Sequence, residues 1–283
     1  MSILGIDIGG TTIKGGLVAD GKVSGYRKVP TCAKEGRAGI TRQLLQLIGE
    51  IGGSDPVGIS TAGRVDPERG VVTYATDNLP GWTGFDLKTF VQERTGRQTA
   101  VINDAVAALL GEVHYGAARG YRDVVMITIG TGIGSAVLRS GAIPSDPDDE
   151  GGWLGHLTYV EDGRPCTCGK RGCLETYISA TALKRDLESQ GFSTRLDGAF
   201  ASEDKRVKAI IDGFLDRLSD AVLKISDRYR PELVVIGGGV VEMKERWWEA
   251  FLDRLGGQVA VAPAELGNDA GIMGAAYFMQ SKL

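Results

Sequence analysis

Three short apolar segments of this chain each run into a glycine-rich turn, and this repetition limits the folds open to it. The segments are residues 3–8, 124–129 and 233–236, and the turns after them are Gly9-Gly10, residues 130–134 and Gly237-Gly238-Gly239. Glycine provides 42 of the 283 residues, about twice its usual share of ~7%. Glycine lets backbone N–H groups approach a ligand closely, so we expect the turns to bind one.

The turns do not match the common nucleotide fingerprints. None contains Gly-x-Gly-x-x-Gly, and the single near match to a P-loop, residues 16–23, lacks its Ser or Thr and crosses a predicted hairpin. There is no short-period repeat and no Pro- or Ser-rich linker. A chain of this length has room for about two domains, which are expected to be closely joined.

Apolar periodicity predicts the order of elements. Residues 3–8, 13–18 and 23–29 predict antiparallel strands, with Asp20-Gly21 as a hairpin turn. Amphipathic spacing predicts helices over residues 40–51 and 207–225. Further helices are expected at 104–113 and 274–279, and further strands at 57–60, 100–102, 124–129 and 233–236. The mixture predicts an α/β protein.

The net charge and the cysteine content indicate where the protein is located and which classes of partner it binds. The net charge of −4 argues against a broad nucleic-acid surface, and no apolar run is long enough to span a membrane. The first residues show no signal-peptide pattern, so a cytoplasmic location is expected. There the four cysteines are expected to be thiols or metal ligands.

The first glycine turn has the residues of a phosphate site. Asp7 ends the apolar strand, where it can order Mg²⁺ or its waters, and Lys14 adds a cation. Backbone N–H groups and hydroxyls can hold phosphate oxygens at Gly9, Gly10, Thr11 and Thr12. The alternative is a plain hairpin with a solvated carboxylate.

Two later turns extend the pattern. Gly130, Thr131 and Gly132 open a second candidate phosphate cradle, whose alternative is a simple turn between two strands. Gly237, Gly238 and Gly239 would let a flat adenosine lie close to the backbone. Together the three turns resemble those of the sugar kinase/actin/Hsp70 ATPase superfamily.

That resemblance implies a two-lobed fold in which each lobe begins with a β-hairpin carrying a phosphate turn, and ATP and sugar bind in the interlobe cleft. We expect residues 1–116 and 270–283 to form the N-terminal lobe. Residues 117–269 are expected to form the C-terminal lobe, with the second phosphate turn, the metal site and the adenosine turn.

Asn103-Asp104 follows a predicted strand and opens a helix. Phosphoryl transfer to a hydroxyl needs a group that accepts the hydroxyl proton. Asp104 fits this role as the catalytic base, and Asn103 can orient a neighbouring sugar hydroxyl. The alternative is that Asp104 only caps the helix.

A cysteine cluster gives the most specific signal in the sequence. Three thiolates and one imidazole make a closed tetrahedral Zn²⁺ site, so a structural zinc is expected. The ligand residues are His156, Cys166, Cys168 and Cys173.

The sequence resembles the ROK family of bacterial sugar kinases and repressors, and the resemblance runs from residue 5 to beyond residue 270. The matching stretches are residues 5–11, 78–82, 103–104, 130–134, 155–156, 166–175, 237–239 and 269–271. The resemblance implies ATP-dependent phosphorylation of a hexose or N-acylhexosamine, usually at the 6-hydroxyl. It also implies Asp104 as the base, ATP and Mg²⁺ contacts from Asp7, Thr11, Thr12 and Thr131, and sugar contacts from Asn78, Asn103, His156 and Glu175.

One position departs from the family pattern. Glucose-specific members usually have Gly-Glu-x-Gly-His, whereas this chain has Trp153 in the place of the Glu. A site that lacks one acceptor discriminates differently among hydroxyls, which favours N-acetylmannosamine over glucose. The other interpretation is that Trp153 points into the core and that other residues set the specificity.

Two alternative functions stay open, and two others are disfavoured. The first is a glucokinase or another hexokinase of the same family, and the second is a non-catalytic sugar sensor. A repressor would need a DNA-binding helix-turn-helix, for which we expect no room before Ile3. An actin-like filament protein would leave the cysteine cluster unexplained. A homodimer is expected by analogy with the family.

Overall fold

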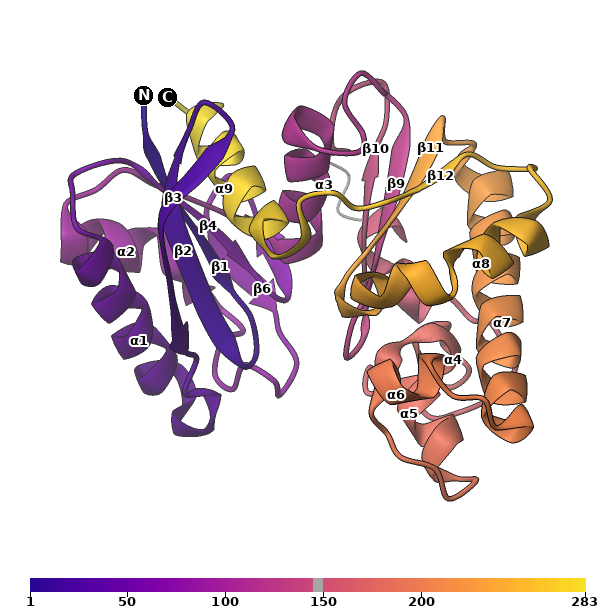
Figure 1. Ribbon diagram of the computed structural model, residues 1–283. Coiled ribbons are helices and arrows are strands. Elements are labelled where there is room, and N and C mark those ends of the chain that lie inside the picture. Colours follow the sequence, from indigo (N-terminus) through magenta and orange to yellow (C-terminus); the bar gives the residue numbers. More distant parts are fainter. Residues whose placement is uncertain (145–149) are drawn as a thin grey trace. The chain divides into compact units, whose positions relative to one another are not determined.

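The computed structural model describes residues 1–144 and 150–283 and divides into two compact units (Figure 1). Unit 1 contains residues 1–119 and 268–283, and unit 2 contains residues 120–267. The sequence had placed the corresponding boundaries after residues 116 and 269. In the described part of the chain, no helix has both the length and the apolar character that a membrane crossing requires.

Unit 1 is built on a five-stranded mixed sheet with the order β3-β2-β1-β4-β8. Its strands are β1 (Ile3–Ile8), β2 (Thr12–Ala19), β3 (Lys22–Pro30), β4 (Val57–Thr61) and β8 (Thr99–Asn103). β1, β4 and β8 are parallel to one another, whereas β2 is antiparallel to both of its neighbours. Because the carboxyl ends of parallel strands meet at one edge of a sheet, β1, β4 and β8 bring their last residues together.

The predicted hairpin joins β2 to β3. Ala19 pairs with Lys22 across Asp20 and Gly21, whose φ angles are 49° and 71°. Positive φ at both central residues is the geometry of a type I′ turn, which follows the twist of the strands. The Asp-Gly pair in the sequence was therefore a correct signal for this turn.

Helices flank the sheet of unit 1, and the last helix of the chain returns to it. They are α1 (Gly36–Ile51), α2 (Leu87–Thr95), α3 (Asp104–Tyr115) and α9 (Ala270–Gln280), and a small sheet of β5 (Arg64–Asp66), β6 (Val71–Tyr74) and β7 (Phe85–Asp86) lies beside them. In Figure 1, α9 (yellow) lies against the strands from the start of the chain (indigo). This contact is close, because a Cβ at Gly5 of β1 would lie 2.2 Å from the Ile272 carbonyl oxygen of α9.

Unit 2 contains a four-stranded sheet with the order β10-β9-β11-β12. The strands are β9 (Val124–Ile129), β10 (Ile133–Leu138), β11 (Leu233–Gly237) and β12 (Val261–Pro263). β9 and β10 form an antiparallel hairpin, and β11 runs parallel to both β9 and β12. Each unit thus contains a hairpin whose turn is one of the predicted phosphate turns, at residues 9–12 and 130–132.

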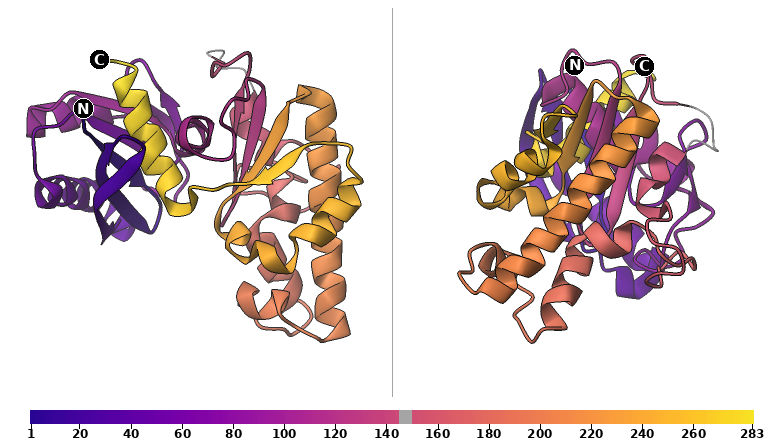
Figure 2. Two further views of the ribbon diagram at one scale, coloured as in Figure 1. Left: turned by 45° about the horizontal axis from the view of Figure 1, so that its top comes forward. Right: turned by 90° about the vertical axis from the view of Figure 1, so that its right-hand side faces the viewer.

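The helices of unit 2 cover its sheet and position the cysteine-rich loop. They are α4 (Glu175–Ile178), α5 (Ala180–Glu188), α6 (Leu196–Phe200), α7 (Lys205–Tyr229) and α8 (Trp248–Leu255), with 3-10 helices η2 (Glu150–His156) and η3 (Gly239–Arg246). α7, orange in Figure 2, is the long amphipathic helix that the sequence predicted. Its buried residues Phe214, Leu218 and Val222 share one core with Val125 and Val234 of the sheet.

Candidate active site and metal centre

Asp104 is the first residue of α3 and follows the last residue of β8. Its Oδ1 accepts hydrogen bonds from Asn103 Nδ2 at 2.9 Å and from the Ala105 N–H at 2.8 Å. Asn103 is itself fixed, because its Nδ2 also donates to the Gly63 carbonyl at 2.7 Å and its Oδ1 accepts the Val106 N–H at 3.0 Å. Asn103, rather than Asp104, is therefore the residue that caps the helix. The alternative role of Asp104 as the helix cap is wrong.

The protonation of Asp104 is strongly perturbed. Burial, followed by the charge of Asp7, raises the pKa of Asp104 to about 7. A carboxyl whose pKa lies near neutrality is a better proton acceptor than an ordinary aspartate, because general-base catalysis favours a pKa close to the working pH. Strong perturbation of this kind is typical of functional carboxyls.

Asp7 lies at the same edge of the sheet, on β1, with β4 between it and β8. It is paired in register with Ser60 across β1 and β4, and the Ser60 hydroxyl donates to Asp7 Oδ1 at 2.8 Å. Burial raises the pKa of Asp7, while Ser60 and the charge of Lys14 oppose that rise. A partly buried carboxylate beside a glycine turn fits the predicted role in ordering Mg²⁺.

The turn between β1 and β2 is held by backbone contacts. The Gly9 N–H donates to the Thr12 carbonyl at 3.0 Å, and the Thr31 hydroxyl donates to the Gly9 carbonyl at 2.6 Å. Gly10 and Thr11 are exposed, as a turn that binds phosphate requires. Asn78, the predicted sugar ligand, is exposed beside Gly10, with its Cβ 3.6 Å from the position that a Cβ of Gly10 would take.

Two further residues lie at this edge, Ser60 and Gly271. The sequence predicts only a buried strand at Ser60, and Gly271 belongs to a stretch that resembles the family. A Cβ at Gly271 would lie 3.0 Å from Asp7 Cγ and 3.3 Å from Ser60 Oγ, so the start of α9 packs directly on the Asp7 carboxylate. Lys14, by contrast, donates to Asn268 Oδ1 at 2.7 Å, which turns its ammonium group toward the segment before α9.

The second phosphate turn lies in unit 2 and touches Glu175. The Gly130 N–H donates to the Gly132 carbonyl at 3.0 Å, and Thr131 at the tip is exposed. Glu175 Oε2 accepts the Ile133 N–H at 2.8 Å. A predicted sugar ligand is therefore also a hydrogen-bond partner of the phosphate turn, a contact that the sequence gave no sign of.

The third glycine turn follows β11. Gly238 has φ 87°, and a Cβ on it would lie 2.5 Å from the Ile129 carbonyl oxygen. Glycine is therefore required at this position, where the turn packs against the end of β9. Gly239 has open space around it, which fits the expectation that a flat group lies there.

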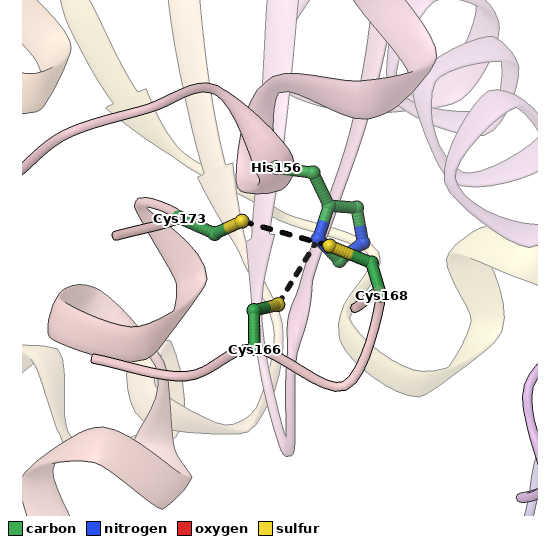
Figure 3. Close-up of side chains that lie close together, drawn as sticks. All are labelled: His156, Cys166, Cys168 and Cys173. Carbon is green, nitrogen blue, oxygen red and sulfur yellow. Dashed lines mark hydrogen bonds between the residues drawn. The ribbon is translucent and has the colours of Figure 1, made fainter. Parts of the chain in front are cut away.

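The cysteine cluster has the shape of a zinc site. His156 Nδ1 and the Sγ atoms of Cys166, Cys168 and Cys173 all lie within 4.8 Å of one another, and Figure 3 shows them facing a common point. Cys166 Sγ is 3.5 Å from His156 Nδ1, and Cys168 Sγ is 3.6 Å from Cys173 Sγ. A zinc tetrahedron with ordinary bond lengths has edges of about 3.6 Å (S···N) and about 3.8 Å (S···S), so the residues fit this metal.

Trp153 lies against the metal ligand His156. The two rings meet edge-on, with centroids 4.5 Å apart and planes at 69°, and the Trp153 side chain is only partly buried. Trp153 therefore does not point into the core. An apolar ring therefore stands beside the metal ligand His156.

The candidate residues form two groups, one in each unit. Unit 1 brings together Asp7, Asn103 and Asp104 at the carboxyl edge of its sheet, with the turn at residues 9–12 and Asn78 beside that turn. Unit 2 brings together Glu175, the metal cluster and the second phosphate turn, while Gly238 follows at the end of the neighbouring strand β11.

Comparison with known proteins assigns the family. A model of the ROK family matches residues 3–282. The chain is 32% identical to a glucokinase from Thermotoga maritima, covering 100% of this chain and 98% of the relative. It is 26% identical to an N-acetylmannosamine kinase from Vibrio cholerae, covering 98% and 99%.

A solved structure agrees with these relatives. A ROK family glucokinase from Streptomyces griseus, in complex with glucose and AMPPNP, matches with a TM-score of 0.86 at 28% identity, covering 99% of this chain and 100% of that one. The resemblance inferred from the motifs is thereby confirmed. This chain belongs to the ROK family and has the actin-like ATPase fold of its sugar kinases.

Proposed function

We propose that this protein transfers the terminal phosphoryl group of ATP to the 6-hydroxyl of a hexose or an N-acylhexosamine, with Asp104 as the base. The observation that carries the proposal is the Asp104 carboxyl, held by Asn103 at the carboxyl edge of the unit 1 sheet, with a pKa raised to about 7. The kinases among its relatives support the same reaction.

The proposed reaction needs one proton transfer and one displacement. Both short hydrogen bonds to Asp104 end on Oδ1, so Oδ2 is the oxygen that would accept the proton of the sugar hydroxyl. That hydroxyl oxygen forms a bond to the γ-phosphorus, the bond between the γ-phosphorus and its bridging oxygen breaks, and ADP leaves. Asn103 and Asn78 would orient the sugar.

The nucleotide would be held by the glycine turns of both units. Gly9, Gly10, Thr11 and Thr12 would donate to phosphate oxygens from unit 1, and Gly130, Thr131 and Gly132 would do so from unit 2. Asp7 would bind Mg²⁺ directly or through water, and Mg²⁺ would neutralise phosphate charge. Gly237, Gly238 and Gly239 would contact the adenosine.

Zinc would have a structural role. The set of three cysteines and His156 fills a tetrahedron and leaves no open position for substrate. By holding His156 Nδ1, the metal would fix the ring so that its other nitrogen can contact the sugar. Free thiols that serve as metal ligands fit a reducing compartment, so we propose a cytoplasmic location.

Two observations favour different sugars. Trp153 offers no acceptor beside His156, which favours an N-acylhexosamine such as N-acetylmannosamine. The higher identity to a glucokinase favours glucose, the alternative substrate. By analogy with the family we also propose a homodimer, and the net charge of −4 gives no support for nucleic-acid binding.

A substrate panel tests the proposal. ADP release from ATP and Mg²⁺ is measured with glucose, mannose, fructose, allose, glucosamine, N-acetylglucosamine and N-acetylmannosamine. A preference for N-acetylmannosamine supports Trp153 as a determinant of specificity, and a preference for glucose makes that assignment wrong. Sugar binding without any sugar-dependent ADP release would identify a sensor and refute the kinase.

A further inference from the structure

The short helix α4 connects the metal loop to the second phosphate turn. It begins two residues after the last metal ligand, Cys173. Its first residue, Glu175, accepts the Ile133 N–H at the exit of the turn at 2.8 Å. Just beyond the helix, the Ala180 N–H donates to the Gly130 carbonyl at the entrance of the turn at 2.9 Å. One segment therefore holds both ends of the turn.

The fit between Glu175 and the turn is close. A Cβ at Gly132 would lie 2.2 Å from Glu175 Oε2, so the carboxylate occupies the space that any other residue at position 132 would need. The other oxygen, Oε1, lies 3.9 Å from Cys166 Sγ. Glu175 thus contacts a metal ligand with one carboxylate oxygen and the phosphate turn with the other.

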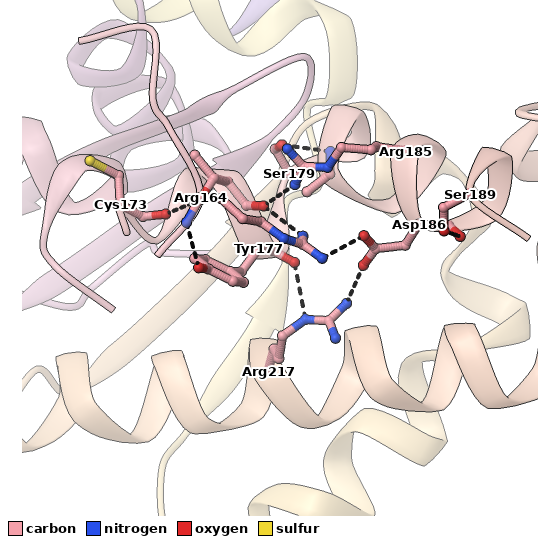
Figure 4. Close-up of polar contacts among 10 residues, drawn as sticks. Arg164, Cys173, Tyr177, Ser179, Arg185, Asp186, Ser189 and Arg217 are labelled. Atoms are coloured by element: carbon pink, nitrogen blue, oxygen red, sulfur yellow. Dashed lines mark hydrogen bonds and ion pairs between the residues drawn. The ribbon is translucent and has the colours of Figure 1, made fainter. Parts of the chain in front are cut away.

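A cluster of three arginines and one aspartate holds the other end of α4 (Figure 4). Arg164 Nη1 donates to the Thr176 carbonyl at 2.9 Å, and Arg217 Nε donates to the Tyr177 carbonyl at 3.2 Å. Arg185 also donates to the Thr176 carbonyl. Cationic donors stabilise the carbonyl end of a helix, and here they fix the position of a single-turn helix that could not persist alone.

Asp186 is the centre of this cluster. Its Oδ1 pairs with Arg164 Nη2 at 2.7 Å and its Oδ2 with Arg217 Nη2 at 2.9 Å, while its own side chain is only 16% exposed. One carboxylate therefore aligns two of the three arginines. Removing the charge of Asp186 would leave these guanidinium groups crowded together without compensation, and such a loss is costly at a partly buried site.

We propose that α4 is a rigid coupling through which the metal loop sets the shape of the second phosphate turn, with Arg164, Asp186 and Arg217 as its positioning residues. The proposal rests on the proposed function, because it takes the turn at residues 130–132 to bind nucleotide phosphates. It assigns to the cysteine-rich loop an effect on nucleotide affinity, in addition to its proposed effect on the sugar through His156.

The test compares Asp186→Asn with Asp216→Asn in the zinc-loaded protein. Asp216 lies on α7 next to Arg217, but it pairs with Arg254 and is 66% exposed, so it is a matched control. We measure the affinity for MgADP by calorimetry, the zinc content, and hydrogen exchange in a peptide that contains the Ile133 amide. The amide is a direct reporter, because Glu175 accepts its hydrogen bond.

For Asp186→Asn we expect full zinc content, faster exchange at Ile133 and MgADP affinity lower by about tenfold, which corresponds to about 1.4 kcal/mol. Asp216→Asn should match the wild type in all three. If Asp186→Asn fails to fold, Arg217→Lys keeps the charge, loses the paired geometry, and should show a smaller change in the same direction.

Two results would overturn the coupling. The first is a folded variant at position 186 or 217 with wild-type Ile133 exchange and MgADP affinity within twofold of the wild type, while the wild type binds MgADP and phosphorylates a sugar. In that case the kinase assignment stands and only the coupling fails. The second is a wild-type protein that does not bind MgADP, which refutes the proposed function and the coupling together.

Discussion

Asp7 and Asp104 share one edge of the unit 1 sheet, and the charge of Asp7 adds to burial in raising the pKa of Asp104 to about 7. The two carboxyl groups come from β1 and from the residue after β8, with β4 between them. Two nearby carboxylates in a partly buried site do not ionise independently. In the proposed reaction, Asp7 would serve the metal and the phosphates, and Asp104 would accept the proton.

The first prediction concerns the pH dependence of turnover. Asp104 accepts a proton only when it is ionised, so kcat/KM should fall about tenfold per pH unit below the pKa of about 7. Rates are measured from pH 5 to 9 with saturating MgATP, and thermal unfolding at each pH verifies that the protein stays folded. A profile that is flat down to pH 5.5 would contradict the assigned base.

The second prediction concerns stability, and its sign follows from the same pKa. The folded-state pKa of about 7 lies above the ordinary value of 3.8, so the folded protein binds the proton more tightly than the unfolded chain. The contribution of Asp104 to stability is therefore fully present below about pH 4 and is lost as the pH rises from about 4 to about 7. Asp104→Asn removes this loss and should raise the Tm by several degrees at pH 7.5.

At pH 4.5 the same comparison should give a much smaller difference, because Asp104 is then neutral in the folded wild type and the pH lies only slightly above the ordinary pKa of 3.8 that applies to the unfolded chain. Asp20→Asn is the control, since Asp20 lies exposed in the hairpin turn and Asn suits its positive φ equally well. A Tm for Asp104→Asn that is lower than the wild-type value at pH 7.5 would show that burial of this charge costs nothing.

The third prediction separates stability from activity at Gly271. A Cβ there would come within 3.0 Å of Asp7 Cγ, so Gly271→Ala should displace the carboxylate and raise the KM for MgATP at least several-fold. Alanine is a better helix former than glycine by about 1 kcal/mol. Because this gain opposes the cost of the close contact with Asp7, the free energy of unfolding should change little. Gly49→Ala in α1, where a Cβ meets nothing within 4 Å, should be stabilised with unchanged kinetics. Equal kinetics in both variants would contradict the role of this contact.

The fourth prediction concerns the metal. The wild type should bind one zinc per chain, and Cys168→Ser should lose most of it and weaken sugar affinity, because His156 loses its fixed orientation. Cys32→Ser is the control, since Cys32 stands apart from the cluster. Zinc is measured by elemental analysis and sugar binding by calorimetry. Wild-type zinc content in Cys168→Ser would show that the cluster is not the metal site.

Local patterns in the sequence predicted the elements that local interactions determine. The Asp20-Gly21 turn, β9 and α7 follow from turn chemistry, β-branched runs and helical spacing. The sheet of β5, β6 and β7 was missed, because its strands are two to four residues long and carry too little periodicity to detect. The start of α9 was placed four residues late, since Ala270 and Gly271 show no apolar period.

Residues of the candidate site were predicted where strand ends and glycine turns mark them, as at Asp7, Asn103 and Asp104. Ser60 and Gly271 were not, because their contacts depend on tertiary structure. Ser60 reaches Asp7 only through the parallel pairing of β1 with β4, and Gly271 reaches it through the return of α9 to the sheet. The hydrogen bond from the Ile133 N–H to Glu175 also depends on tertiary structure, because the two residues are 42 positions apart in the sequence.

The most direct test of the central claim is sugar-dependent ADP release by Asp104→Asn at pH 7.5, with the best sugar from the panel and saturating MgATP. The substitution keeps an acceptor at Oδ1 for Asn103 and Ala105 but removes the proton acceptor, so kcat should fall by about 10²–10⁴ with little change in sugar affinity. Turnover within tenfold of the wild type would contradict Asp104 as the base.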